Sequence, residues 1–486
     1  MLSITLKRIL RANFLPFFDF DYAFNTYLPN LCSMDVGICW FRKDLRLTDN
    51  PAWTNACLAG QVIPVFVLEQ SLVNSASSLK RDVFFSHLLA LKTELNDLGG
   101  DLLIINGPAE KAIPKLIARC GAKSLYFNDD SSPFSRARDR KVKSLSNVPS
   151  HTYWGNLIHP PGAVLTSSGT VSKVFTPFYK KWVTTPISPV GQVSKLVFGT
   201  LPSDLNEKIN VHPTPLMTPG SEGAQNRLEA FLTRADEYDN SRDYPFIDAT
   251  SRLSSDLHFG TIGPREICSV INETSDSGKA FVRQLAWRDW YSHLLFKSPE
   301  IISLPANPAY GKINWRNNKD DYFAWEEGKT GYPIVDAGMR ELNETGFMHN
   351  RVRMITGSFL VKHLLTDWRI GEKYFRQILL DGDVSQNIGN WQWVAGTGFD
   401  AAPYFRIFNP VRQSEKFDNN GNYIRKWVPE LADVDKKDIH APWLADSHDL
   451  ASKGVKLGTD YPYPIVDHAY ARERCLTTYK LARENT

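Results

Sequence analysis

Four short apolar runs, separated by stretches with helical spacing, dominate the chain between residues 36 and 127. Runs of about four to eight apolar residues are typical of buried strands. The segments between them, such as Arg81–Leu98 and Ala109–Cys120, have the length and spacing of helices. Strands that alternate with helices predict right-handed crossovers and a mostly parallel, Rossmann-like sheet, so the first domain is predicted to be α/β. The predicted strands are Val36–Phe41, Val62–Leu68, Leu102–Ile105 and Ser124–Phe127.

The remainder of the chain has a different pattern. No glycine-rich loop of the dinucleotide-binding or Walker type follows a predicted strand, so a nucleotide cofactor is expected elsewhere. Pro, Ser, Thr and Gly are frequent between Gly155 and Gly223, which is typical of a long connection. From Ala224 onward helical spacing predicts an almost entirely α-helical domain. We therefore divide the chain into an N-terminal extension (1–33), expected to be poorly ordered, an α/β domain (34–160), a linker (161–223) and a helical domain (224–486).

Composition limits the classes of function. Hydrophobic residues make up 42% and charged residues 22% of the chain, and no apolar run is long enough to cross a bilayer. The net charge of +3 is too small to predict nucleic-acid binding by itself, so such binding requires a local basic patch. The six cysteines are scattered without metal-site spacing. They favour a reducing compartment, and we expect the cytoplasm, or the nucleus or an organelle in a eukaryotic source.

Two segments of the helical domain bring aromatic and polar side chains together. Helical geometry places Trp391 and Trp393 about 200° apart, so that one faces the interior and the other a cavity; the alternative is that both are core residues. In the segment Lys279–Phe296 one helical face mixes amide, indole, guanidinium and phenol groups. That mixture suits a cavity that stacks bases and holds a phosphate, and a domain-interface helix is the alternative. The face comprises Gln284, Trp287, Arg288 and Tyr291.

Two further segments are weaker signals by themselves. The helix that begins near His349 has an apolar stripe, and its other face carries Asn350, Arg351 and Met354. An arginine in such a position is more often a partner in a surface ion pair than a ligand contact. The stretch from Thr250 to Ser254 precedes a helical run, where it serves either as a phosphate site or as an ordinary N-cap.

Taken together, the motifs resemble those of the photolyase/cryptochrome family, and within it the class I cyclobutane pyrimidine dimer photolyases. The likeness extends from Met34 nearly to the end of the chain. It rests on WFRKDLR at Trp40, TSRLS at Thr250, MHNRVRM at Met348, and DGDVSQNIGNWQWVAGTGFDAAPYFRIFNP at Asp381. The last run is long and highly specific.

The resemblance implies a helical domain that holds a folded-back FAD beneath an opening for a flipped-out pyrimidine dimer. Arg353 would lie against the isoalloxazine and pair with Asp381, because an unpaired buried guanidinium is costly. Asn387 would face flavin N5 and favour the reduced flavin. The cofactor-binding residues implied in this way are Tyr238, Thr250, Ser251, Arg252, Leu253, Ser254, Arg353, Asp381, Gly382, Asp383 and Asn387.

The resemblance also implies an electron relay and a DNA-binding surface. Trp391, Trp368 and Trp315 would carry electrons between the flavin and the protein surface. Trp287 and Trp393 would contact the extruded dimer, which already pairs poorly and is therefore easier to flip out. The implied DNA- and lesion-binding residues are Arg242, Gln284, Trp287, Arg288, Asn350, Arg351, Met354, Trp393, Arg406 and Gln413. We expect a monomer that binds UV-damaged DNA and requires no metal or membrane.

The implied reaction is light-driven. Fully reduced FAD absorbs blue or near-ultraviolet light and donates an electron to the dimer; the cyclobutane bonds split and the electron returns. A second, antenna chromophore of the folate or deazaflavin type is left open, because Ser135 stands where folate-binding members have a glutamate.

Gln284 is the main departure from class I, whose members often have a glutamate there, whereas (6-4) enzymes and several cryptochromes have glutamine. Against (6-4) repair, the sequence His349-Asn350-Arg351 replaces the paired histidines expected for that chemistry. Three alternatives therefore accompany dimer repair: (6-4) repair, a blue-light receptor that binds FAD without repairing DNA, and a non-catalytic DNA-binding flavoprotein.

Overall fold

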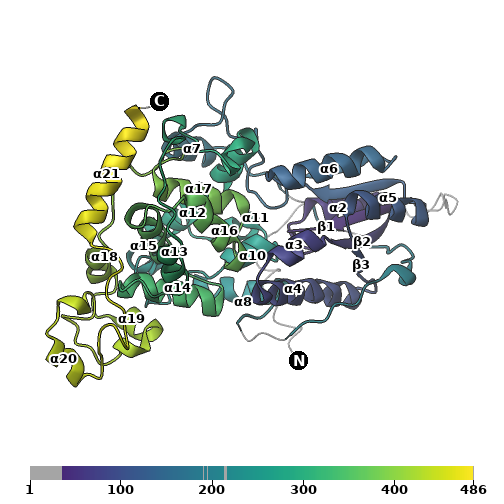
Figure 1. The fold of residues 1–486 in the computed structure, drawn as a ribbon. Helices are drawn as coiled ribbons and strands as arrows, with labels where there is room; N and C mark the ends of the chain where they lie inside the picture. Colours follow the sequence, from purple (N-terminus) through teal and green to yellow (C-terminus); the bar gives the residue numbers. More distant parts are fainter. Residues whose placement is uncertain (1–34, 190, 194, 213–215, 485–486) are drawn as a thin grey trace, which may run out of the picture. The chain divides into compact units, whose positions relative to one another are not determined.

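The N-terminal part of the protein is a five-stranded parallel sheet (Figure 1). The computed structural model describes residues 35–189, 191–193, 195–212 and 216–484; the predicted extension 1–33 lies outside them. The strand order is β3-β2-β1-β4-β5, so the predicted α/β class is confirmed. The strands are β1 (Val36–Phe41), β2 (Gln61–Leu68), β3 (Leu103–Asn106), β4 (Ser124–Asn128) and β5 (Ser150–Tyr153).

Helices cover both faces of this sheet because its central strands are apolar on both sides. In β1, Ile38 and Trp40 pack on one face, and Cys39 and Phe41 on the other, as the two-residue period of a strand requires. The first face meets α5 (Ala109–Cys120) and α6 (Pro133–Leu145), whereas α4 (Ser78–Asp97) covers the second (Figure 1). The remaining helices of this part are α2 (Pro51–Ala59) and α3 (Gln70–Ser75).

The connection after β5 is not wholly irregular. It contains α7 (Phe175–Trp182), which packs against the long helix α12 (Asp276–Lys297). Further along, the chain returns to the sheet, where the N–H of Val62 donates to the carbonyl of Val197 at 2.9 Å and that of Gly199 to Val62 at 3.0 Å. The connection therefore contacts both the helical part and the sheet.

From Gly220 to the end of the described chain the regular elements are helical. Two apolar cores hold this part together, one around α14 to α17 and the other around α7, α8 and α12. No helix of the described chain has the length and apolarity that a membrane span needs. The other helices are α8 (Gly220–Leu232), α9 (Tyr238–Ser241), α10 (Ser254–Phe259), α11 (Pro264–Val270), α13 (Lys319–Glu326), α14 (Pro333–Thr345), α15 (Asn350–Ser358), α16 (Trp368–Ile378), α17 (Val384–Ala395), α18 (Pro410–Phe417), α19 (Asn422–Trp427), α20 (Ser447–Ser452) and α21 (His468–Glu484).

Candidate functional site

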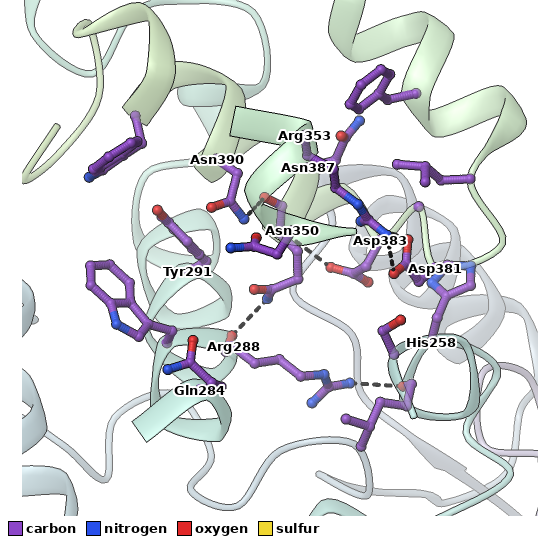
Figure 2. Close-up of a pocket in the computed structure, with 18 of the residues that line it drawn as sticks. His258, Gln284, Arg288, Tyr291, Asn350, Arg353, Asp381, Asp383, Asn387 and Asn390 are labelled. Atoms are coloured by element: carbon purple, nitrogen blue, oxygen red, sulfur yellow. Dashed lines mark hydrogen bonds and ion pairs between the residues drawn. The ribbon is translucent and has the colours of Figure 1, made fainter. Parts of the chain in front are cut away.

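A cavity of about 450 Å³ opens among α10, α12, α15, α17 and the segment 379–383 (Figure 2). Arg353 and Asp381 point toward each other on one side of it, and Gln284 and Arg288 lie on the other. Sixteen of the residues singled out from the sequence line this cavity: Tyr238, Ser251, Ser254, Gln284, Trp287, Arg288, Tyr291, Asn350, Arg353, Met354, Asp381, Gly382, Asp383, Asn387, Trp391 and Trp393.

A second cavity, of about 930 Å³, adjoins the first, because both are lined by Gln284, Arg353 and Asp381 among others. Its border mixes charges: Lys279 and Arg283 face the same space as Asp239 and Asp276. The predicted residues that line it are Tyr238, Arg242, Thr250, Ser251, Arg252, Leu253, Ser254, Gln284, Trp287, Asn350, Arg351, Arg353 and Asp381.

Helix α12 supplies one side of the first cavity. Its N-terminus is capped by Ser275, whose side chain accepts from the N–H of Gly278 at 3.0 Å. The mixed face predicted from helical spacing is directed to the cavity, including Tyr291. Helix α17 approaches this face closely at Gly389, where a Cβ atom would overlap the ring of Tyr291. The glycine therefore permits the contact between the two helices that enclose the site.

Arg353 and Asp381 form a two-pronged ion pair. The guanidinium donates to both carboxylate oxygens, at 3.0 and 2.8 Å, and its Nε donates to the carbonyl of Met348 at 2.7 Å. Burial opposes ionisation of Asp381, but the neighbouring guanidinium is strong enough to lower the pKa of this carboxyl below its ordinary value. The pair is thus charged and fixed in orientation.

Asp383 begins α17 and also reaches the α/β part. Its Oδ1 accepts from the backbone N–H of Ser385 at 3.0 Å and caps the helix. The other oxygen lies 3.5 Å from Nζ of Lys43, which is also 3.3 Å from Asp130. Burial would raise the pKa of Asp383, but Lys43 and the hydroxyl of Ser385 lower it well below its usual range. The residue is therefore negatively charged at neutral pH, at the cavity.

Two more side chains near Asp383 were missed by sequence reasoning. Lys80 of α4 donates to the carbonyl of Arg376 at 3.0 Å, and burial lowers the pKa of Lys80 to about 8. His258 lines the cavity, and its Nδ1 is buried without a hydrogen-bond partner. Burial, with Lys80 and Lys43 nearby, lowers the pKa of His258 well below its usual value. The imidazole is therefore neutral, with a nitrogen available to a bound molecule.

Asn387 is oriented by a residue of the neighbouring helix. Its Nδ2 donates to Glu372 of α16 twice, at 2.8 Å to the carbonyl and 3.0 Å to Oε1. Both acceptors are oxygens, so they fix which end of the amide carries the nitrogen. The amide oxygen is then the end left for the cavity. Glu372 is itself buried, and burial raises its pKa.

The stretch Thr250 to Ser254 turns sharply into α10. Arg252 has a φ of +56°, a left-handed conformation that is uncommon outside glycine. Its Nε donates to Asp248 at 3.0 Å, and its guanidinium lies over the ring of Phe347. These contacts hold the turn, which places Ser251 and Ser254 on both cavities.

The arginines expected to bind DNA differ in the partners that their guanidinium groups contact in the protein. The guanidinium of Arg288 donates to the carbonyls of Asn156 and Leu257, inside the protein. A phosphate would have to compete with both carbonyls, so the role of Arg288 in holding flanking DNA stays a prediction. Arg351 pairs with Asp243 at 2.7 Å.

Three other predicted DNA contacts lie nearer the surface. Arg242 pairs with Asp239 at 3.1 Å and lines the second cavity. Arg406 is exposed, and Gln413 lies half-buried on α18. Neither Arg406 nor Gln413 lines the two cavities. These two residues can therefore contact only a ligand that extends beyond the cavities.

The three tryptophans of the predicted relay share one hydrophobic core. Trp391 is buried at the cavity, and its ring lies 4.9 Å from that of Phe375 and 6.3 Å from that of Trp325. Trp368 is buried at the first residue of α16, which packs on α17. Trp315 is half-buried and meets the ring of Tyr479 edge-on at 6.1 Å. The ring of Trp325 is an aromatic neighbour that sequence reasoning missed.

Ser135, which bears on the antenna question, is turned into the α/β part. Its N–H donates to the Ser132 hydroxyl at 3.3 Å, and its own hydroxyl donates to Asp130 at 3.2 Å. Among the described residues, no group of three or more His, Cys, Asp or Glu side chains is placed to hold a metal ion.

Comparisons with known proteins agree with this geometry. A family model described as DNA photolyase matches residues 37–194, and another, described as the FAD binding domain of DNA photolyase, matches residues 281–481. A protein of Agrobacterium fabrum named deoxyribodipyrimidine photo-lyase is 40% identical over 475 residues, covering 92% of this chain and 98% of that protein.

Solved structures show the same architecture. The crystal structure of a bacterial class III photolyase from Agrobacterium tumefaciens has a TM-score of 0.86 at 38% identity, covering 94% of this chain and 100% of the other. That of a Synechocystis cryptochrome has a TM-score of 0.83 at 28% identity, covering 93% and 100%. The similarity in both cases includes the α/β and helical parts together.

Proposed function

This chain belongs to the DNA photolyase family and has its FAD-binding domain, and from that premise we propose that it repairs cyclobutane pyrimidine dimers in DNA by light-driven electron transfer. The observation that carries the proposal is a single cavity with two different sides. Charged and amide groups, among them Arg353, Asp381 and Asn387, line one side, and Trp287 and Trp393 are part of the same lining.

The residues present are suited to FAD. The buried Nδ1 of His258 has no hydrogen-bond partner and therefore needs one, and Asn387 lines the same cavity with its amide nitrogen already bound to Glu372. At Gly382, which lines the cavity, a Cβ would lie 3.0 Å from both the carbonyl oxygen of Arg376 and Nζ of Lys80, so the chain packs closely against the protein there. The hydroxyls of Ser251 and Ser254, at the turn into α10, suit the phosphate and ribityl portions. When bound, reduced FAD supplies a light-absorbing electron donor.

On this side of the cavity, the protein orients the Asn387 amide and can thereby favour a protonated ring nitrogen of the bound flavin. Because Glu372 occupies the Asn387 nitrogen, the amide presents an acceptor to the cavity. An acceptor favours a ring nitrogen that bears a proton, as N5 of a reduced flavin does. The Arg353–Asp381 pair holds a guanidinium beside the same space without adding net charge.

On the other side the residues suit an extruded lesion. Trp287 and Trp393 offer flat surfaces that compensate for lost base stacking, and Asn350 and Met354 line the same cavity. Gln284 is exposed, and its amide nitrogen donates only to the carbonyl of its own helix at Ala280, 3.1 Å away. That bond is easily exchanged for a pyrimidine carbonyl.

The photolyase class, the type of lesion, the oligomeric state and the antenna are finer assignments. The class I subdivision stays a prediction, since the Agrobacterium tumefaciens relative is described as class III. Dimer repair is preferred to (6-4) repair because Asn350, an amide, lines the cavity beside Met354. His349 is buried as the N-cap of α15, where burial lowers its pKa to about 4. A monomeric state and an antenna chromophore likewise stay predictions.

A blue-light receptor is the second candidate, favoured by the similarity to the Synechocystis cryptochrome. One assay separates the candidates. Reduced, flavin-loaded protein is incubated with DNA that carries one defined cyclobutane dimer or one (6-4) lesion, with and without blue light, and the restored thymines are counted. We expect light-dependent restoration of the cyclobutane dimer. Flavin uptake without restoration in light would favour the receptor, and restoration of only the (6-4) lesion would overturn the assignment of substrate.

A further inference from the structure

The connection between the α/β part and the helical part contributes one aromatic ring that packs against Trp287, a residue of the proposed lesion-binding surface. Phe175, the first residue of α7, stacks on Trp287 with ring centroids 3.6 Å apart and an interplanar angle of 10°. The two rings are therefore nearly parallel and in full contact. Phe175 is 1% exposed and does not line either cavity, whereas Trp287 lines both.

The position of Phe175 is fixed from several directions. Its backbone N–H donates to Oδ2 of Asp400 at 3.0 Å, in the loop that follows α17. Three residues earlier, the carbonyl of Ser172 accepts from the indole N–H of Trp290 at 2.8 Å. The ring of Trp290 also meets Phe175 edge-on at 5.8 Å. Both α12 and the loop after α17 thus hold the segment 172–175 in place.

The indole of Trp287 is surrounded on its protein side. Trp290 meets it edge-on at 5.1 Å, and Tyr291 lies 5.7 Å away. With Phe175 against one face and these two rings from its own helix, the indole has little freedom to rotate. Its remaining surface belongs to the cavities.

We propose that Phe175 is a positioning residue that holds Trp287 ready to receive the extruded dimer. This inference rests on the proposed function, since it assumes that Trp287 contacts the lesion. Association with a ligand is weakened by each side chain that must be ordered at that moment. Stacking on Phe175 orders the indole in advance, so the protein binds damaged DNA more tightly than it would with a mobile tryptophan. The expected benefit is limited to lesion DNA, because undamaged duplex presents no flipped base.

The test compares two buried phenylalanines of the same helix. Phe175→Leu removes the stack, whereas Phe178→Leu removes a ring that is equally buried but meets His293 edge-on. Flavin-loaded proteins are titrated in the dark against a duplex with one cyclobutane dimer and the same duplex without it. We expect Phe175→Leu to reduce the preference for the damaged duplex by about tenfold, as the loss of a well-oriented aromatic pair allows. Phe178→Leu should leave the preference unchanged. Should Phe175→Leu fail to fold, Phe175→Met fills a similar volume without a ring.

A double-mutant cycle shows whether Phe175 acts through Trp287. In the Trp287→Leu background, Phe175→Leu should cause no further loss of preference. An additional loss there, or an equal loss with Phe178→Leu, would overturn the positioning role. Loss with Trp287→Leu but none with Phe175→Leu would overturn this inference and leave the proposed function intact. If Trp287→Leu itself binds damaged DNA normally, the proposed lesion surface is wrong and the inference is overturned with it.

Discussion

Gln284 is the residue of the site that bears most directly on efficiency. Its neutral amide can donate to a pyrimidine carbonyl, but it offers neither the acidic proton nor the charge of a carboxyl group. Because a protonated carboxyl group donates a stronger hydrogen bond than an amide to the negatively charged oxygen of the reduced dimer, Gln284→Glu should raise the repair yield per photon, up to about twofold. The yield is measured as thymines restored per absorbed photon. Gln284→Ala is the control and should lower the yield; an unchanged or lower yield with glutamate would contradict the prediction.

The Arg353–Asp381 pair should be the most sensitive single contact of the site. Asp381→Asn leaves a guanidinium that is only 25% exposed without its counter-charge, which costs about 3 kcal/mol in the free energy of unfolding. Urea unfolding measures this loss, and the ratio of flavin to protein absorbance should fall with it.

The matched control is Asp204→Asn. Asp204 pairs with Arg119 on the surface, where both side chains are about 60% exposed, and such pairs contribute less than about 1 kcal/mol. Equal destabilisation by the two substitutions would show that Asp381 has no special role.

At this scale the sequence predicted some partners and missed others for a physical reason. The Arg353–Asp381 contact was expected from the family resemblance, in keeping with the need of a buried guanidinium for a carboxylate. Glu372 and Lys43 were missed, since each meets its partner only through the fold: Lys43 and Asp383 lie 340 positions apart. Arg288 was assigned to DNA from the family resemblance, and its bonds to the carbonyls of Asn156 and Leu257, in distant segments, could not be read from the sequence.

Asp383, which caps the start of α17, should make the free energy of unfolding depend on pH. The pKa of Asp383 is lower in the folded protein than in an unfolded chain, so its ionisation adds stability above the unfolded pKa of about 4 and this contribution disappears as the pH falls through the folded value. The difference in unfolding free energy between the wild type and Asp383→Asn should therefore be constant above about pH 5 and shrink below about pH 4. Urea unfolding between pH 7 and pH 3 measures it. Glu327→Gln, which alters an exposed pair with Lys329, should show a much smaller change, and a difference that grows in acid would refute the argument.

The relay can be tested on α17 as well. Trp391→Phe should remove most of the light-driven reduction of bound oxidised flavin by an external reductant, because Trp391 is the one of the three predicted relay tryptophans that lines the cavity. The reduction is measured as the change in flavin absorbance during illumination. Trp325→Phe is the control, since its ring also contacts Trp391 but is not assigned to the relay. Equal losses would mean that the route is not specific to the three predicted tryptophans.

Elements were predictable where the local pattern is strong. The four apolar runs became β1 to β4, and the mixed face of α12 is directed to the cavity as its spacing indicated. Strand β5 has the sequence SHTY and is only partly buried at the edge of the sheet, so hydrophobic patterning could not find it. Helix α7 lies in a Pro-, Ser- and Thr-rich region, and its function depends on a contact with α12 that no local pattern records.

For the whole molecule, the net charge of +3 leaves DNA affinity to a few surface cations. Each phosphate contact that is lost should lower the slope of log affinity against log salt by about 1. We expect this change for Arg406→Gln, whose side chain is exposed. Arg288→Gln is the matched comparison and should leave the slope unchanged, since its guanidinium is bound to protein carbonyls. Titration of damaged duplex at four salt concentrations measures both slopes, and a reduced slope with Arg288→Gln would support its assignment to DNA.

The division into an α/β and a helical part was predictable from periodicity alone. The contacts between lysines of the α/β part and the helical part near the site were not predictable in this way. Lys43 and Lys80 come from the α/β part, yet Lys43 pairs with Asp383, which lines the cavity, and Lys80 donates to the carbonyl of Arg376. The two halves of the polypeptide are consequently not interchangeable modules. A hybrid that takes residues 34–160 from one relative and the remainder from another would bring Lys43 and Asp383 from two parents, and its success in retaining flavin should depend on whether both donated compatible charges at these positions.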